Sequence, residues 1–139
     1  MDPTRDISVL YRKMNMLTNL RLAHLGISGA KAIFLFCIRD HKAMSQVEIC
    51  KELDMDKSTV AKMLMRMEKD GLIQKTVNPE DVRSVRVSLT DKAMELVGQA
   101  QKVMNQWVAD ATSDLTREEQ EAFFVLLEQV ANKAVRMAE

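Results

Sequence analysis

The sequence predicts a mainly α-helical fold with a small β-hairpin wing, arranged as a winged helix-turn-helix core with long N- and C-terminal dimerisation helices. Two short helical segments, 45–54 and 57–71, are separated by a two-residue turn. A strand, turn and strand pattern follows at 72–90, with basic residues near its tip. Long apolar stripes at helical spacing lie toward both ends of the chain. Because this outline places one helix in a DNA groove, we expect DNA binding.

Capping signals set the limits of the two short helices. Ser45 and Glu48 have the spacing of a capping box, in which each side chain satisfies a free amide at the other position. Asp56 is expected to cap the second helix in the same way, which keeps the connecting turn short. Gly71 supplies the left-handed conformation that ends a helix at little cost.

The second short helix has two distinct faces. The residues at core spacing are Val60, Met63, Leu64 and Met67. Their spacing predicts that they face the interior. The residues expected on the opposite face, where DNA contact is predicted, are Ser58, Lys62, Met65, Arg66 and Lys69, with Thr59 at its edge.

The hairpin is predicted from alternation and turn chemistry. Val85, Val87 and Leu89 alternate with Arg86 and Ser88. This period of two is typical of a half-buried strand. The turn at 78–81 contains Asn, Pro and Asp, which favour tight turns. Asp81 and Arg83 are expected to form an ion pair that orients the guanidinium outward, and Ser84 and Arg86 complete the predicted DNA-contacting residues of the wing.

The formal net charge of zero at first argues against a nucleic-acid partner, but the charges are unevenly distributed. Residues 57–86 include seven basic and four acidic side chains, whereas residues 87–139 include five basic and nine acidic ones. Positive charge is therefore concentrated in the proposed reading helix and wing. Phosphate should repel the acidic C-terminal helices, and this polarity would orient the protein on DNA.

Composition is that of a small folded protein. With 139 residues, 47% of them apolar, and only two Pro and four Gly, the chain has room for a sizeable core but none for a long linker. No apolar stretch approaches the roughly 20 residues of a membrane span, and the N-terminus lacks the apolar core of a signal peptide. We expect a cytoplasmic protein that does not contact the membrane.

Residues 58–75 (STVAKMLMRMEKDGLIQK) and 80–90 (EDVRSVRVSLT) resemble the winged-helix core of the MarR family, the bacterial multiple-antibiotic-resistance regulators. The most specific piece is Asp81-x-Arg83 followed by Leu89-Thr90 at the start of a long helix. One helix pair before the core and two long helices after it extend the resemblance over essentially the whole chain. Two positions depart from the pattern: Ala93, where many members have Gly, and the apolar Met65.

The apolar stripes predict self-association. They comprise Ile7, Leu10, Met14 and Leu17; a series from Ala93 to Ala111 that includes Leu96, Val103 and Trp107; and a last series from Phe123 to Ala138 that includes Phe124, Leu127 and Val130. A winged-helix core of this size cannot cover three such stripes. The expected division is a DNA-binding domain at 28–90 and a helical dimerisation region at 1–27 and 91–139.

The resemblance implies a homodimeric transcription regulator, most simply a repressor, on a palindromic operator in double-stranded DNA. It also implies a small-molecule effector that releases the operator. The pocket for that effector is expected where the dimer helices meet the winged domain, near the N-terminal helices and the start of the helix at 90–111.

Other classes are less well supported by the residues. A winged helix that binds a partner protein would not need Lys62, Arg66 and Arg83 together. Thiol-based redox sensing would use Cys37 or Cys50, but apolar surroundings make thiols unreactive. His24 and His41 have no neighbours at metal-ligand spacing, and no phosphate loop or catalytic constellation is present, so neither a metal, a cofactor nor an enzyme is expected.

Overall fold

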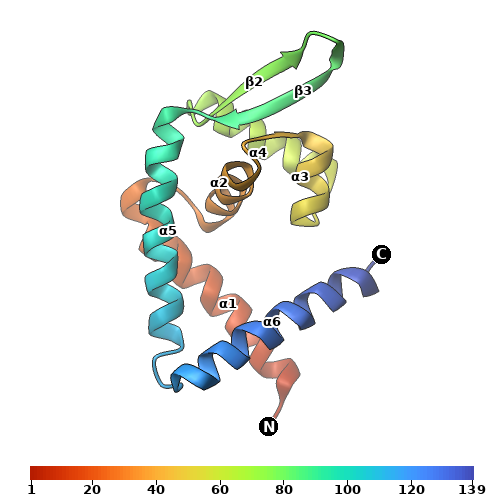
Figure 1. The fold of residues 1–139 in the computed structure, drawn as a ribbon. Coiled ribbons are helices and arrows are strands. Elements are labelled where there is room, and N and C mark those ends of the chain that lie inside the picture. The colour runs from red at the N-terminus through yellow and green to blue at the C-terminus, as the bar shows by residue number, and fades with distance from the viewer. The chain divides into compact units, whose positions relative to one another are not determined.

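A computed structural model of the chain describes the backbone of residues 1–139 and all side chains except those of residues 78 and 82–84. Its elements, drawn in Figure 1, are α1 (Pro3–Leu22), the 3-10 helix η1 (Ala23–Leu25), α2 (Gly29–His41), β1 (Ala43–Ser45), α3 (Gln46–Leu53), α4 (Lys57–Lys69), β2 (Ile73–Asn78), β3 (Asp81–Leu89), α5 (Asp91–Ala111) and α6 (Arg117–Met137). The predicted fold class is confirmed. The chain forms two compact units, Met1–Met104 and Asn105–Glu139.

The small sheet has one strand more than the sequence predicted. The strand order is β1-β3-β2, and both pairings are antiparallel. Val87 of β3 lies opposite Met44 of β1 on one side and Lys75 of β2 on the other. Because β1 joins the hairpin to the chain segment just before α3, the wing is tied to the helix-turn-helix through backbone hydrogen bonds.

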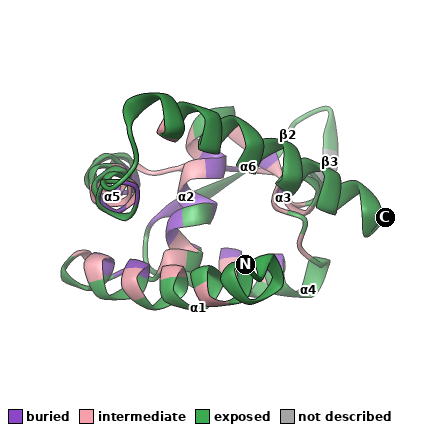
Figure 2. Ribbon diagram, turned by 90° about the horizontal axis from the view of Figure 1, so that it is seen from below, coloured by how far each residue is buried: buried purple, intermediate pink, exposed green. Residues whose placement is uncertain are grey.

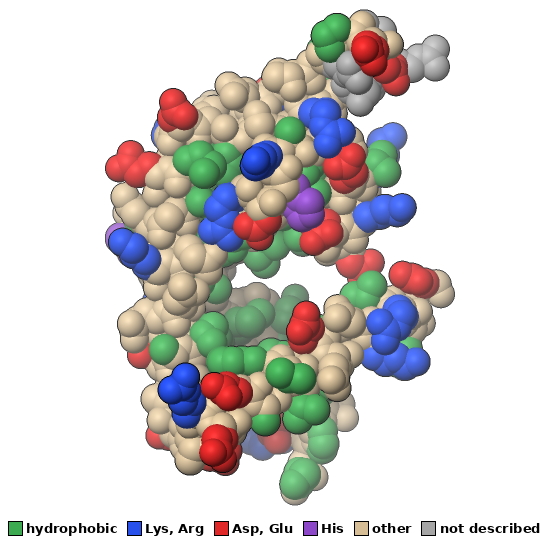
Figure 3. Space-filling model, in the orientation of Figure 1, with side chains coloured by type: hydrophobic (Ala, Val, Ile, Leu, Met, Phe, Trp, Pro, Cys, Tyr) green, Lys and Arg blue, Asp and Glu red, His purple; other side chains and the backbone are tan. Residues whose placement is uncertain are grey.

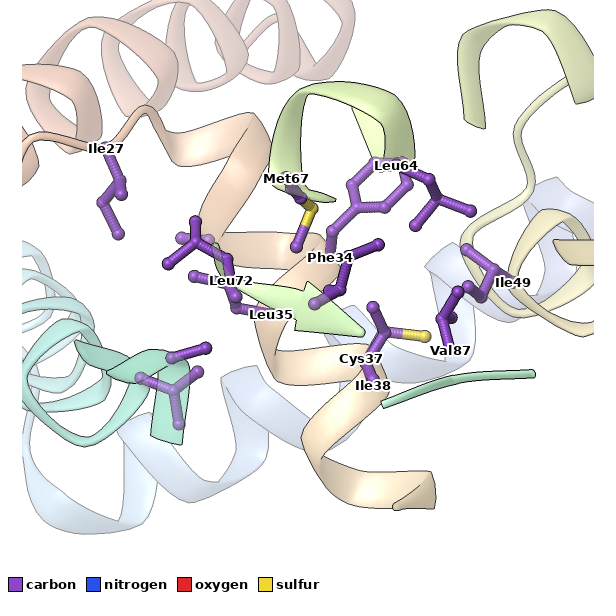
Figure 4. Packing of buried hydrophobic residues seen from close by; sticks show 14 of the residues in the cluster. Ile27, Phe34, Leu35, Cys37, Ile38, Ile49, Leu64, Met67, Leu72 and Val87 are labelled. Atoms are coloured by element: carbon purple, nitrogen blue, oxygen red, sulfur yellow. The ribbon is translucent and has the colours of Figure 1, made fainter. Parts of the chain in front are cut away.

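The core of the first unit is built around α2. Figure 2 shows the buried residues of this unit, and Figure 4 shows the side chains that meet at its centre. Phe34, Leu35 and Ile38 of α2 are each no more than 1% exposed. Their cluster includes Ile49 of α3, Leu64 and Met67 of α4, Leu72, and Val87 of β3. One core therefore holds both helices of the turn motif and the base of the wing.

The ends of α4 form as the sequence predicts. The backbone N–H of Thr59 donates to Asp56 Oδ1 at 2.8 Å, which caps the N-terminus. At the C-terminus Gly71 has a φ of +73°, in the left-handed region that favours glycine. Its N–H donates to the Glu68 carbonyl at 3.0 Å, and the Leu72 N–H donates to the Met67 carbonyl at 2.8 Å. This pair of bonds is a Schellman motif, which stops the helix and turns the chain into β2.

The second unit contains the end of α5 and the whole of α6. Thr116 and Glu119 form a capping box, with a hydrogen bond in each direction, at the start of α6. The Gln120 amide also donates to the Thr112 carbonyl at 2.9 Å, which closes the corner between the helices. All residues from 121 to 139 are exposed in the single chain. The predicted apolar side chains of α6, including Phe123, Phe124, Leu127 and Val130, are thus left uncovered within this unit.

Candidate nucleic-acid interface

The exposed face of α4 is the centre of the candidate interface. The six side chains predicted to lie on it, Ser58, Thr59, Lys62, Met65, Arg66 and Lys69, are all exposed. On the other face Val60, Leu64 and Met67 are 0–3% exposed, and Met63 packs against the same core. The predicted division of α4 into two faces is confirmed. The helix therefore presents three cations, two hydroxyls and one thioether on a surface that the protein's own core does not use.

Thr59 has a structural task at the start of α4. Its hydroxyl donates to Asp56 Oδ2 at 2.8 Å, in addition to the backbone bond of the cap. These two hydrogen bonds from Thr59 are the main reason that the pKa of Asp56 is lowered from its ordinary value. The carboxylate therefore stays ionised and holds the first turn of α4. Both Ser58 and Thr59 are exposed, but the Thr59 hydroxyl is engaged in this cap.

Arg86 joins the wing to the helix-turn-helix. Its Nη2 donates to the Ala43 carbonyl oxygen at 3.0 Å. Its two terminal nitrogens also lie 3.3 and 3.4 Å from the two carboxylate oxygens of Glu48. The guanidinium therefore connects β3 to β1 and to α3 at once. We had predicted Arg86 as a DNA contact, and the structure shows that it also has partners within the protein.

Glu48 explains why the capping box predicted at the start of α3 forms only in part. The Ser45 half of the predicted capping box forms, since the Glu48 N–H donates to Ser45 Oγ at 3.2 Å. The Glu48 carboxylate, however, pairs with Arg86, which lies 38 residues away in the sequence. A charged partner gives a carboxylate a stronger hydrogen bond than a neutral amide does. Sequence reasoning missed this pair because its two members belong to different elements.

The wing carries the remaining predicted contacts. The side chains of Arg83 and Ser84 lie outside the described residues, so the ion pair expected between Asp81 and Arg83 stays a prediction. Asp81 itself is exposed. On the other strand Lys75 Nζ lies 3.6 Å from Glu68 Oε1, which ties β2 to the last turn of α4.

Charge on the surface is mixed. On the face drawn in Figure 3, Lys and Arg side chains alternate with Asp and Glu among the residues described. This mixture is in keeping with the formal net charge of zero. Attraction of DNA would therefore come from the local cluster of Lys62, Arg66 and Lys69 on α4 and from the wing, because charges beyond about 10 Å are largely screened at ordinary salt.

The C-terminal end of α4 is fastened to α2 and α5. Lys31 Nζ of α2 lies 3.0 Å from Asp70 Oδ2, and Lys92 Nζ of α5 donates to the Asp70 carbonyl at 3.0 Å. The hydrogen bond from Lys31 is the largest cause of the lowered pKa of Asp70. The Thr90 hydroxyl donates to the Gly71 carbonyl at 2.7 Å, just before α5 begins. The reading helix is thus bonded directly to the first turn of α5.

A cavity of about 320 Å³ lies at this junction. It is lined by Leu25, Gly26, Ile27, Lys31, Asp70, Leu72, Lys92 and Leu96. Its lining is mixed, because four apolar side chains share it with two ammonium groups and one carboxylate. The cavity lies beside the end of the N-terminal helical segment and the start of α5, the region where an effector pocket was expected.

The two cysteines lie in different surroundings. Cys37 is 7% exposed, and burial, with smaller contributions from Glu52 and Asp40, raises its pKa to about 11. Its Sγ lies 3.6 Å from the sulfur of Met44. Cys50 is partly exposed, beside Val47 and Lys57. At neutral pH the Cys37 thiol is therefore protonated and is a poor nucleophile.

Alkylation kinetics should reveal this difference. With iodoacetamide at neutral pH, we expect Cys50 to be modified first and Cys37 to remain mostly unmodified, as followed by peptide mass spectrometry. Because only the thiolate reacts, the rate at Cys37 should rise about tenfold per pH unit until the pH approaches its pKa. A fast reaction of Cys37 at neutral pH in the folded protein would contradict this expectation.

The role of Arg86 can be tested through its partner. If Arg86 acts by holding the wing against α3, Glu48→Ala should weaken DNA binding by up to about fivefold, the size of an exposed ion pair. The double variant with Arg86→Ala should then be no weaker than Arg86→Ala alone. Glu52→Ala on the same helix removes the same charge and serves as the control. If Glu48→Ala strengthens binding instead, Arg86 is a phosphate contact that Glu48 restrains.

No group of three or more His, Cys, Asp or Glu side chains among the described residues is arranged to hold a metal ion. No single helix in the described part of the chain is long and apolar enough to span a membrane. Pro3–Leu25 and Gly29–His41, which are bent relative to each other, reach that length and apolar character only as a pair.

Comparison with known proteins gives consistent matches. The model of one protein family, described as the MarR family, matches residues 31–85. The HTH-type transcriptional regulator BilQ of Clostridioides difficile (strain CD3) is 30% identical over 74 residues, which are 53% of this chain and only half the length of BilQ. The HTH-type regulator YybA of Bacillus subtilis (strain 168) is 22% identical over 97% of this chain and 90% of its own length.

The solved structures that match include a mutant MarR from E. coli in complex with operator DNA. It is 30% identical to this chain, with 91% of each chain covered and a TM-score of 0.82. The reduced form of MarR from E. coli is 29% identical, covers 94% of this chain and 96% of its own, and gives a TM-score of 0.80. These matches extend beyond the winged core to the long helices at both ends.

Proposed function

The chain belongs to the MarR family of DNA-binding transcription regulators, and from this premise we propose that it is a homodimeric repressor of a palindromic operator. The observation that carries the proposal is the exposed, cation-rich face of α4 on a capped helix-turn-helix. The major groove of DNA admits an α-helix, and Lys and Arg are the side chains that bind phosphates and guanine edges there. The likeness to a MarR variant that was solved in complex with operator DNA supports the DNA-binding step of this proposal.

The proposed contacts divide between the helix and the wing. In the major groove we place Ser58, Lys62, Arg66 and Lys69, with Thr59 at the edge of the contact. In the wing we place Asp81, Arg83 and Ser84, with Arg83 entering the minor groove, where negative potential favours an inserted arginine. Arg86 would support the wing through its bonds to the Ala43 carbonyl and the Glu48 carboxylate. Two copies related by a two-fold axis would read half-sites about 34–36 Å apart.

Dimerisation is proposed from the uncovered apolar helices. On α1, Ile7 and Leu10 are 64% and 46% exposed, and on α6, Leu127 and Val130 are 47% and 62% exposed. Large contiguous apolar patches are rare on the surface of monomeric proteins. A second copy of the chain would cover the same patches on both subunits, as a two-fold interface requires.

The proposed functional division is a DNA-binding domain at 28–90 and dimerisation segments at 1–27 and 91–139. The packing of the single chain has its own boundary, between residues 104 and 105. The difference arises because α1 and most of α5 share a compact unit with the winged core. We therefore expect α1 and most of α5 to belong to the dimerisation segments while packing in the same compact unit as the DNA-binding domain.

A small-molecule effector is the further step of the proposal. The cavity at the junction of η1, α2, α4 and α5 has a volume of about 320 Å³, within the range of small-ligand pockets. Lys31 and Lys92 at its edge favour a molecule that joins an apolar body to a negative group. Such a ligand would compete with Asp70 for the two ammonium groups. Its binding would therefore loosen the attachment of α4 to α2 and α5.

Salt dependence tests the DNA-binding step. After selection of an operator from a random DNA pool, log K measured by fluorescence anisotropy should fall with log salt, with a slope of about −0.9 for each phosphate neutralised. If Lys62 contacts one phosphate in each subunit, Lys62→Ala should make the slope shallower by about 1.8. Lys102→Ala removes an exposed charge from α5 and should leave the slope unchanged.

The same titration distinguishes the proposal from its rival. An affinity that barely responds to salt would contradict the electrostatic contacts. A chain that selects no sequence from the pool would instead favour a winged helix that binds a partner protein.

A further inference from the structure

We infer that Met65 is a specificity-determining residue that reads the C5-methyl group of a thymine in each half-site of the operator. The inference rests on the DNA-binding function proposed above. Met65 lies on α4 and is 65% exposed. All thirteen side chains of α4 are described, and among them Met65 is the only large apolar side chain in the exposed class.

The position of Met65 on the helix is central to the candidate interface. At 3.6 residues per turn, it shares a face with Ser58, seven residues before it, and Lys62, three before it. Lys69, four residues after it, continues the same row. The buried residues Val60, Leu64 and Met67 lie on the opposite side. Any ligand that covers the cations of this face must therefore also cover Met65.

Met65 belongs neither to the core cluster nor to the apolar side chains packed against it. The other methionines of α4 belong to the core, with Met67 fully buried and Met63 packed against it. Because 65% of its surface is exposed, Met65 contributes little packing to the fold. The Met65 thioether lies among cations that are suited to phosphates. A polyanion that also carries an apolar group would therefore fit this surface.

DNA offers such a group in the major groove. Thymine presents its C5-methyl there, beside the hydrogen-bonding edges of the bases, and no other base carries a methyl group. Methionine is long and unbranched, so it can adapt to a methyl group at the floor of the groove while its neighbours bind elsewhere. Lys62 and Arg66 are suited to guanine edges or phosphates. The half-site should therefore contain a thymine next to bases contacted by these cations.

The size of the effect follows from the group removed. Replacing thymine with deoxyuridine deletes the methyl group and leaves every hydrogen-bonding atom of the base in place. Loss of contact with one such group should weaken binding about fourfold at each half-site, the equivalent of about 0.8 kcal/mol. This change can be made at one position at a time.

The experiment uses the full-length protein and an operator selected from a random DNA pool. Each thymine is replaced in turn by deoxyuridine, symmetrically in both half-sites, and affinities are measured for the wild type and for Met65→Ala. We expect one position at which the wild type loses affinity on removal of the methyl group and Met65→Ala does not. The control is Met94→Ala, which removes a 47% exposed methionine from α5 and should keep the wild-type response.

The possible results test the role of Met65 separately from the proposed DNA-binding function. Binding that never depends on a thymine methyl, or that depends on it equally in the wild type and Met65→Ala, would overturn the role of Met65 and leave the DNA-binding function intact. A protein that binds none of the pool would overturn both. If Met65→Ala also shows native thermal unfolding, a lost methyl response cannot be attributed to misfolding.

Discussion

Replacing Leu127 and Val130 together with glutamate should abolish dimerisation and weaken operator binding by about two to four orders of magnitude, because two linked half-site contacts become independent. Both side chains lie on the apolar face of α6 and are exposed in the single chain. Two carboxylates placed there would have to be buried against a second copy without partners, which is strongly unfavourable. Sedimentation and anisotropy at the same protein concentration would measure the two losses.

A matched variant makes this result interpretable. Gln129→Glu with Asn132→Glu adds the same two charges to the same helix at polar positions, and it should remain dimeric and bind the operator. If the Leu127 and Val130 variant remains a dimer that binds with wild-type affinity, α6 is not part of the interface. A protein that dimerises as before but no longer binds DNA would also contradict the proposal.

Phe34→Ala should cause the largest loss of folding stability in the winged core, about 3–5 kcal/mol in the free energy of unfolding. Phe34 is 1% exposed and lies in the cluster that joins α2 to α3, α4 and the base of the wing. Its truncation would leave a cavity at the one place where these elements meet. The expected loss is a large part of the 5–15 kcal/mol that stabilises an ordinary domain.

Urea unfolding followed by circular dichroism would measure this loss. The protein concentration must be held constant, because association adds to the apparent stability of a dimer. Ile33→Ala is the neighbouring control, since Ile33 is 45% exposed and its truncation leaves no enclosed cavity. Equal losses for the two variants would mean that the core is not organised around Phe34.

The turn motif could be predicted because its signals are local. Asp56 and Gly71 each act within a few residues of their own position, and the structure shows both in the predicted roles. The face of α4 follows from periodicity alone, since Val60, Leu64 and Met67 repeat at the spacing of one helical side. The DNA contacts predicted on the other face remain a proposal that rests on exposure and charge.

The features that the sequence did not reveal depend on distant partners. β1 is only Ala43–Ser45, too short to show an alternating pattern, and it exists because β3 pairs with it from more than 40 residues away. Arg86 was read from its place in the wing, but Glu48 and Ala43 meet it only after the chain folds. Local spacing pointed Glu48 toward Ser45, and a charged partner from another element outcompeted that neutral amide.

If α4 enters the DNA groove as proposed, the bonds between the end of α4 and the start of α5 would transmit motion of α5 to the DNA. Thr90 and Lys92 hold the carbonyl groups of Gly71 and Asp70, so the chain has no slack between the reading helix and the helix that follows the wing. At about 1.5 Å per residue, the 21 residues of α5 make a lever roughly 32 Å long. We expect a tilt of α5 at its first turn to move α4 through these two bonds. The angle at which α5 leaves the winged core, rather than any change inside the turn motif, would then decide whether two reading helices match the pitch of DNA.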